Sequence, residues 1–236
     1  MSKRGLKSDA IIAIVFSFVG GLLDVYCLFN FNVYATLHTG NLIKLMTHLV
    51  DGNLAAFLDT TFVIVAFAVG IFLTNMYENS RKKREERELF VISFVLLLLA
   101  ALAPNDRAPG ELSAWKRIAA FLLGLEGAFL IRSFIRFGEY SYSATTMTAN
   151  INRLVTVIHK RVRENDRSQN YAILVYTMIF LSFLLGVACG YGYLHAVPVK
   201  ESGWWHWYGY NLILLAPMAC MIWLWFATPL RKRHRE

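Results

Sequence analysis

The sequence predicts an all-α polytopic membrane protein with six transmembrane helices, arranged as two inverted three-helix repeats that each contain a broken or re-entrant segment. Three observations lead to this prediction. Hydrophobic residues make up 56% of the 236 residues and charged residues only 17%, against about a quarter in soluble domains. Six apolar segments are separated by polar stretches. A similar seven-residue motif follows the first and the fourth of these segments.

The six apolar segments approach the length of a membrane span. A helix needs about 20 apolar residues to cross a hydrocarbon core about 30 Å thick. The segments are Ala10–Phe29, Leu54–Tyr77, Leu89–Ala103, Ile118–Ile131, Tyr171–Leu194 and Tyr208–Thr228, and each carries at most one charged residue. The fourth helix is expected to begin earlier, near Ala114. Six such runs leave too little polar sequence to cover a soluble fold, so buried core helices of a soluble protein are the less favoured interpretation.

The chain is therefore divided into five regions. These are a cytoplasmic N-terminus (1–9), a first repeat (10–103), an outer loop (104–113), a second repeat (114–228) and a basic cytoplasmic tail (229–236). Small residues four apart predict close helix packing. They occur as Ser17 with Gly21, Ala66 with Gly70, and Gly186 with Gly190.

Lys and Arg residues are unevenly distributed among the connecting segments. With the N-terminus inside, the inner regions hold eighteen and the outer regions five, with Arg132 left out at a helix end. For a protein in the plasma membrane, the positive-inside rule then predicts that both termini lie in the cytoplasm. The net charge of +8 is spread over four regions on one membrane face. Anionic lipid headgroups explain it, and nucleic acid is not expected as a partner.

Two similar motifs lie 109 residues apart, at Thr39–Leu45 and Thr148–Leu154. The Thr, the Asn and the final Leu are identical in the two. An odd number of helices per half places the second half upside down relative to the first. Inverted repeats are typical of secondary transporters, whose binding sites lie near the bilayer midplane at discontinuous helices.

The segments before these motifs, 30–38 and 137–147, are too polar to continue the preceding helices. Each leads into a short helix-like run, Asn41–Val50 or Thr148–Val162, which is either re-entrant or interfacial. Thr39 and Thr148 are expected to cap these short helices. Free N–H groups at the helix N-termini would then be available to an anion.

The run from Gly20-Gly21 through Asp24-Val25-Tyr26, followed by Thr39-Gly40-Asn41, resembles the YoaK-like family of bacterial inner-membrane proteins over nearly the whole chain. The resemblance implies a multi-pass fold in the bacterial inner membrane. It implies no activity, because the family is a domain of unknown function. The second half departs from the family pattern, with Ala149 where Gly is usual and Gly127 near a usual polar amide.

Two carboxyl groups within the apolar segments are the leading candidates for a proton or cation site. A charged residue at the bilayer centre costs about 2.5–3.5 kcal/mol on insertion scales, so it is a functional hypothesis by default. For Asp24 the alternative is a structural hydrogen bond, for example to Asn41 or Thr39. Glu126 could form a coupled pair with Asp24, or it could be a protonated acid bonded to a backbone carbonyl.

Further polar residues complete the candidate set. His38 could relay protons beside Thr39, or it could be an ordinary loop residue. Arg132 and Arg136 are four apart and are expected on one face at the inner end of the fourth helix, as an anion gate or as lipid-phosphate contacts. The candidate substrate- and ion-binding residues are Asp24, Tyr26, His38, Thr39, Gly40, Asn41, Glu126, Thr148 and Asn150.

The sequence favours a small secondary transporter or permease for a small polar or anionic solute, with proton coupling as one option. It has no metal-ligand spacing and no hydrolase, metalloprotease or phosphate-loop motif. Catalytic residues, metals and cofactors are therefore not expected, although a membrane-embedded enzyme stays open. The alternative is a non-transporting scaffold, sensor or partner subunit, and a homodimer is an option for either. Dry, packed carboxyl groups at Asp24 and Glu126 would favour the scaffold.

Overall fold

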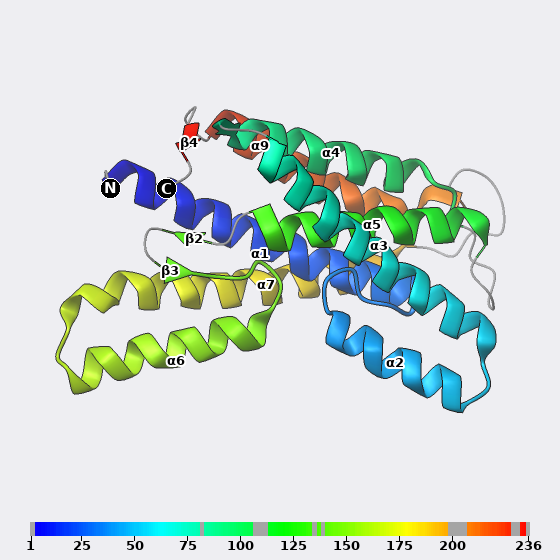
Figure 1. Cartoon of the computed structure of the whole chain (residues 1–236), viewed down its shortest axis with the longest axis horizontal. Helices are drawn as coiled ribbons and strands as arrows, with labels where there is room; N and C mark the ends of the chain where they lie inside the picture. The colour runs from blue at the N-terminus through cyan, green and yellow to red at the C-terminus, as the bar shows by residue number, and fades with distance from the viewer. Residues whose placement is uncertain are drawn as a thin grey trace.

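The computed structural model describes residues 3–80, 83–105, 113–133, 136–137, 140–197, 207–227 and 232–234. The described chain is helical almost throughout (Figure 1). Its α-helices are α1 (Lys3–Phe31), α2 (His38–Val50), α3 (Leu54–Ser80), α4 (Glu86–Leu102), α5 (Ala114–Ser133), α6 (Met147–Arg163), α7 (Asn170–Ala196) and α9 (Leu215–Ala227). Two 3-10 helices, η1 (Arg167–Gln169) and η2 (Tyr210–Leu214), precede α7 and α9.

Two small antiparallel strand pairs accompany the helices. Strand β1 (Lys83–Glu85) pairs with β4 (Lys232–His234), and β2 (Arg136–Phe137) pairs with β3 (Tyr140–Ser141). They are too short to form a layer of their own, so the predicted all-α class is confirmed. Most of the predicted outer loop and of the basic tail lies outside the described residues.

Every predicted apolar segment is helical over most of its described residues. Four stretches are long and apolar enough to cross a membrane: Ser8–Phe31, Leu54–Tyr77, Arg167–Ala196 and Tyr210–Ala227. Glu88–Leu102 is a shorter apolar helix. Helix α5 carries two basic residues near its start, Glu126 in its middle and Arg132 in its last turn, so it is less apolar than these four. The fold is that of a helical membrane protein.

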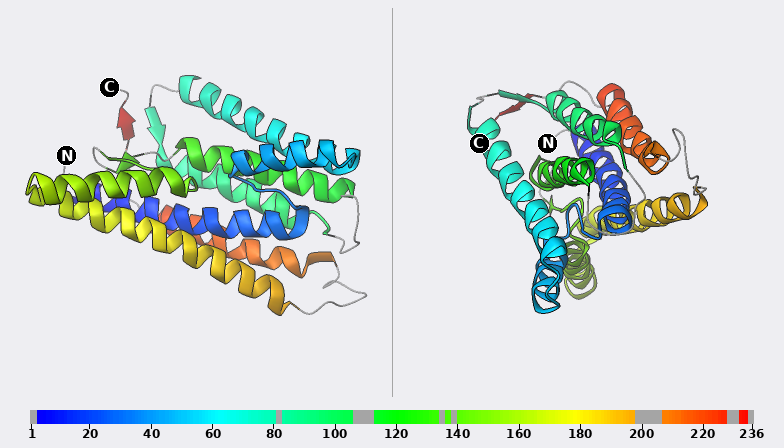
Figure 2. Two further views of the ribbon diagram at one scale, coloured as in Figure 1. Left: turned by 90° about the horizontal axis from the view of Figure 1, so that it is seen from below. Right: turned by 90° about the vertical axis from the view of Figure 1, so that its right-hand side faces the viewer.

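Helix α1 is the centre of the bundle. Within its apolar window 72% of the residues are buried, against 28% in the windows of α3 and α7. Helix α1 packs along α7, and α3 packs along α5 (Figures 1 and 2). A helix that is apolar all round must be buried in protein or face lipid. Helix α1 is covered by its neighbours, whereas α3 and α7 expose many apolar side chains that would face lipid, as do α4 and α9.

Glycines allow the closest helix crossings. Gly186 of α7 lies against the backbone carbonyl of Phe18, and Gly21 of α1 lies against that of Phe183. A Cβ atom on Gly70 would lie 2.6 Å from the Cβ of Ala128 on α5. The predicted packing role of Gly21, Gly70 and Gly186 is confirmed, since small residues let two helix backbones approach.

The long helices run roughly along one axis of the molecule (Figure 1). Helix α1 begins and α9 ends at the same end of this axis, here called the terminal end. Helices α2 and α6 are short and lie at the periphery, packed against α3 and α7 respectively. Figure 1 and the left view of Figure 2 show their N-terminal ends nearer the middle of the axis. Helix α6 runs toward the terminal end and α2 runs toward the opposite end, so we call them the half-helices.

Candidate functional site

The half-helices begin where loops bring the chain back from the ends of α1 and α5. Helix α2 starts at His38 and α6 at Met147. The expectation that Thr39 and Thr148 cap these helices is wrong. Both lie inside the first turn, because each helix starts one residue before its Thr. No side chain caps either start: Leu37 and Thr146 hold the cap positions without a side-chain hydrogen bond.

Asn41 and Asn150 anchor these loops in the same way. Asn41 Oδ1 accepts from the Tyr34 N–H at 2.8 Å, and its Nδ2 donates to the Tyr34 carbonyl at 2.8 Å. Asn150 Oδ1 accepts from the Ser143 N–H at 3.0 Å, and its Nδ2 donates to the Ser143 carbonyl at 2.5 Å. Both amides are buried. The side-chain amide carries an acceptor oxygen and a donor nitrogen side by side, so each amide satisfies both backbone groups of a residue seven positions earlier.

Each loop also crosses a glycine of a long helix from the other half of the chain. Gly127 of α5 lies against the carbonyl of Ala35. A Cβ atom on Gly20 of α1 would lie 2.5 Å from Thr145 Cγ2 and 3.1 Å from the Ala144 carbonyl oxygen. Each loop is thus bonded to an Asn of the half-helix that follows it and packs against a Gly of a long helix from the other half.

Asp24 binds the first loop. Its Oδ1 accepts from the Thr36 N–H at 2.9 Å, and its Oδ2 accepts from the Thr36 hydroxyl at 2.6 Å. The partner is therefore neither Asn41 nor Thr39, the two that the sequence suggested. In the second loop the residue 109 positions after Thr36 is Thr145, whose buried hydroxyl has no partner within the described part of the chain.

Glu126 has a different environment. It is fully buried in the middle of α5. Its Oε1 accepts from the Ser93 hydroxyl of α4. Its Oε2 has no hydrogen-bond partner among the residues that the structure describes. Asp24 and Glu126 are bonded to different hydroxyls, and both are packed away from the surface.

The remaining candidates of the first half divide between surface and interior. Thr39 is exposed, and Gly40 is half-buried against the Tyr34 ring. The His38 ring packs on Phe67, with 3.7 Å between ring centroids, and its buried Nε2 has no partner in the described ranges. In the second half Thr148 is exposed as well.

Tyr26 belongs to a separate network near the end opposite the terminal end. Its hydroxyl donates to Asn211 Oδ1 at 2.6 Å. Asn211 Nδ2 donates to the carbonyls of Ala101 and Ala103, and Asn105 Nδ2 donates to Asn30 Oδ1 at 2.9 Å. This network ties α1 and α4 to η2, and the sequence analysis did not identify it. Its signal was a set of Asn residues at the ends of apolar segments.

The two candidate arginines do not share a helical face, and that prediction is wrong. Arg132 is exposed, and its Nε donates to Asn75 Oδ1 at 2.9 Å. Helix α5 ends at Ser133, and Arg136 lies in β2, opposite Ser141. The chain leaves the helix to form the β2–β3 pair, and residues four apart share a face only within one helix.

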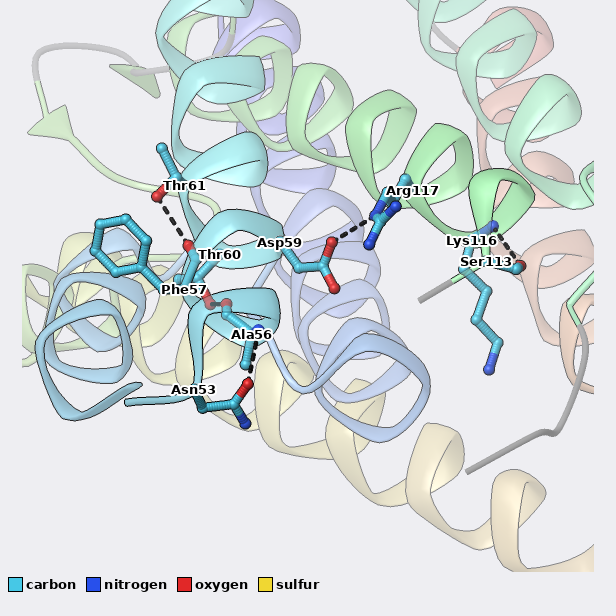
Figure 3. Close-up of polar contacts among 9 residues, drawn as sticks. All are labelled: Asn53, Ala56, Phe57, Asp59, Thr60, Thr61, Ser113, Lys116 and Arg117. Atoms are coloured by element: carbon cyan, nitrogen blue, oxygen red, sulfur yellow. Dashed lines mark hydrogen bonds and ion pairs between the residues drawn. The ribbon is translucent and has the colours of Figure 1, made fainter. Parts of the chain in front are cut away.

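An ion pair joins α3 to α5, as Figure 3 shows. Arg117 Nε donates to Asp59 Oδ1 at 2.6 Å. Helix α3 is capped nearby, where Asn53 Oδ1 accepts from the Ala56 N–H at 3.1 Å. The pair was missed from sequence, although Asp59 and Arg117 are opposite charges near the same predicted end of two helices.

A model of the family described as "Protein of unknown function (DUF1275)" matches residues 12–228. Comparisons with curated proteins and with solved structures gave no match. The match runs from the third turn of α1 to just past the end of α9. It therefore covers both half-helices, both loops and the carboxyl groups of Asp24 and Glu126. The chain belongs to the DUF1275 family, whose function is unknown.

Proposed function

We propose that this protein is a small secondary transporter or permease for a small polar or anionic solute. The pair of half-helices that begin near the middle of the long axis is the observation that supports it most. Non-helical backbone at membrane depth is tolerated only where protein buries it or water lines it. Transporter sites use such broken helices, whose N-terminal dipoles favour negative charge.

The proposal includes two halves related by an inverted repeat. Several pairs of contacts support this relation. Helix α1 packs on α7 as α3 packs on α5, and α2 packs on α3 as α6 packs on α7. The amides of Asn41 and Asn150 make the same two bonds. Alternating access would then rock one half against the other.

Thr39 and Thr148 are proposed to line the solute path. Both are exposed in the first turn of a half-helix. A polar group that faces acyl chains without a hydrogen-bond partner is costly. The surface around Thr39 and Thr148 is therefore proposed to border water, either within one protomer or where a second copy covers it. Asn41 and Asn150 position the path and do not contact the solute.

Glu126 is proposed as the coupling site for a proton or small cation. A buried ionised carboxyl group with an unpaired oxygen is strongly unfavourable, so the free Oε2 of Glu126 favours a proton or cation there. Asp24 has both oxygens bonded by Thr36. Its proposed role is to hold the first loop.

We place the protein in the bacterial inner membrane with the terminal end in the cytoplasm. The last turn of α6, at the terminal end, carries Lys160, Arg161 and Arg163. Such a cluster beside anionic lipid agrees with the positive-inside rule.

The test is current measurement on proteoliposomes by solid-supported-membrane electrophysiology, over a panel of small anions and polar metabolites. Wild type is expected to give a current with at least one solute. Glu126→Gln is expected to lower that current at least about tenfold, because an amide cannot exchange a proton. Asp51→Asn, an exposed acid in the α2–α3 turn, is the matched control and should leave the current unchanged. An equal current from Glu126→Gln would remove the coupling role.

A non-transporting scaffold or partner subunit is the second candidate. The observation that favours it is the dry packing of Asp24 and Glu126, which are 4% and 0% exposed. In a permease this packing corresponds to a closed path. Folded wild type that carries no current with any solute of the panel would support the scaffold.

A further inference from the structure

A polar pocket lies between β3, α6 and the start of α7, toward the terminal end of the molecule (Figure 1). Its volume is about 420 Å³. Its polar lining comes chiefly from Tyr140, Ser141, Arg153, Thr156, Lys160 and Gln169. The lining does not include Thr148, Asn150, Asp24 or Glu126, although Arg153 on its wall donates to Asn150 Oδ1.

Two cations of α6 give this pocket its charge. Arg153 and Lys160 are seven residues apart, so they lie two turns apart on one face of the helix. Of the described lining residues none is acidic. Asp166 is bonded next to this lining, where it accepts from the Ser168 N–H and from Nε2 of the lining residue Gln169.

These cations are weakly engaged. Arg153 Nη1 donates to Asn150 Oδ1 at 3.3 Å, which leaves most of the guanidinium donors for another acceptor. Lys160 Nζ has no hydrogen bond or ion pair with any residue in the described ranges. Ser141 and Thr156 line the same pocket, and the Thr156 hydroxyl donates to the Asn152 carbonyl at 2.8 Å.

The positions of the first half that are equivalent to Arg153 and Lys160 do not carry the same pair of cations. The residue 109 positions before Arg153 is Lys44, whose Nζ donates to the Asn32 carbonyl at 2.9 Å and to Asn32 Oδ1 at 2.7 Å. The residue 109 positions before Lys160 is Asp51. The pair of pocket cations is therefore not repeated at the equivalent positions Lys44 and Asp51, and helix repetition does not explain it.

We infer that this pocket binds a phosphate group. Arg offers a fork of donors that matches phosphate oxygens, and Lys adds a point charge. Two sources carry this chemistry: the headgroup of an anionic lipid, which basic pockets between membrane helices hold, and soluble inorganic phosphate. The inference is independent of transport, since it requires only a bound anion at the terminal end.

The test is binding to purified full-length protein in detergent. Native mass spectrometry measures affinity for dioctanoyl phosphatidylglycerol and for zwitterionic dioctanoyl phosphatidylcholine, and calorimetry measures affinity for inorganic phosphate. The main variant is Lys160→Gln, an exposed site that should fold normally. The matched control is Arg163→Gln, an exposed cation on the same helix that does not line the pocket.

Lys160→Gln is expected to weaken binding about fivefold, the value of one cation near an anionic headgroup. Arg163→Gln should change it less than about twofold. Phosphatidylglycerol that binds more tightly than phosphatidylcholine, with this variant pattern, identifies a lipid ligand. If Lys160→Gln weakens the binding of inorganic phosphate more than Arg163→Gln does, and the two lipids bind with equal affinity, the ligand is soluble phosphate. Equal effects of Lys160→Gln and Arg163→Gln on all three probes would overturn the inference.

Discussion

Gly186→Ala is expected to destabilise the folded protein by about 1–3 kcal/mol, the usual cost of overpacking a core. The new Cβ would meet the carbonyl oxygen of Phe18 and would lie 3.1 Å from the Leu22 amide nitrogen. Both belong to the backbone of α1, which cannot turn aside as a side chain does. The α1–α7 pair would have to separate, so thermal unfolding in detergent should shift to a lower temperature.

Gly192→Ala is the matched control for this effect. Gly192 lies on the same helix, but a Cβ there would meet nothing within 4 Å. Replacing a helical Gly by Ala in open space stabilises by about 0.5–1 kcal/mol. Equal unfolding temperatures for the two variants would contradict the close crossing of α1 and α7.

Asn150→Ala is expected to have the second large effect. It removes both bonds to the Ser143 backbone and leaves two backbone groups without partners. Each unpaired buried group costs about 1–3 kcal/mol. Because both bonds are only part-buried, a loss of about 2–4 kcal/mol of stability is expected, in the lower part of the summed range. Asn41→Ala is expected to have the same effect, because it removes both bonds to the Tyr34 backbone. Thermal unfolding and limited proteolysis at the loops measure both.

Asn152→Ala controls for the loss of an amide on the same helix. Asn152 is exposed, two residues beyond Asn150, and surface changes usually stay within about 0.5 kcal/mol. If Asn150→Ala were as stable as Asn152→Ala, the loops would not depend on these anchors.

Apolar runs and motif spacing were enough to predict much of this fold. Hydropathy located six helical segments, and four of them are long and apolar enough to cross a membrane, because a helix in lipid must be apolar over most of its length. The paired motifs located both half-helices, since a polar stretch cannot continue a buried helix. The glycine positions predicted the close crossings at Gly21, Gly70 and Gly186.

The polar contacts could not be predicted from the sequence, because they join residues that are distant in the chain. Glu126 bonds Ser93, 33 residues away, and Asp24 bonds Thr36 across the loop. No local pattern selects these partners from the other hydroxyls. Helix boundaries caused the other errors: each half-helix starts one residue before its Thr, which places Thr39 and Thr148 inside the first turn and off the cap positions. The early end of α5 separated Arg136 from Arg132.

The claim that Thr39 and Thr148 border a water-filled path is the centre of the proposed function. It is tested most directly by cysteine accessibility, which needs no knowledge of the solute. The background replaces Cys27, Cys189 and Cys220 by Ala. Single cysteines at 39 and 148 in lipid vesicles are then treated with a charged methanethiosulfonate reagent, which reacts only in water.

Two further positions calibrate the rates. Asp51→Cys, on the exposed α2–α3 turn, sets the rate in water, and Val65→Cys, 49% exposed in the middle of α3, sets the rate against lipid. The proposed path predicts that Thr39→Cys and Thr148→Cys react at rates close to that of Asp51→Cys. Rates as slow as that of Val65→Cys at both positions, in folded protein, would contradict the path and favour the scaffold.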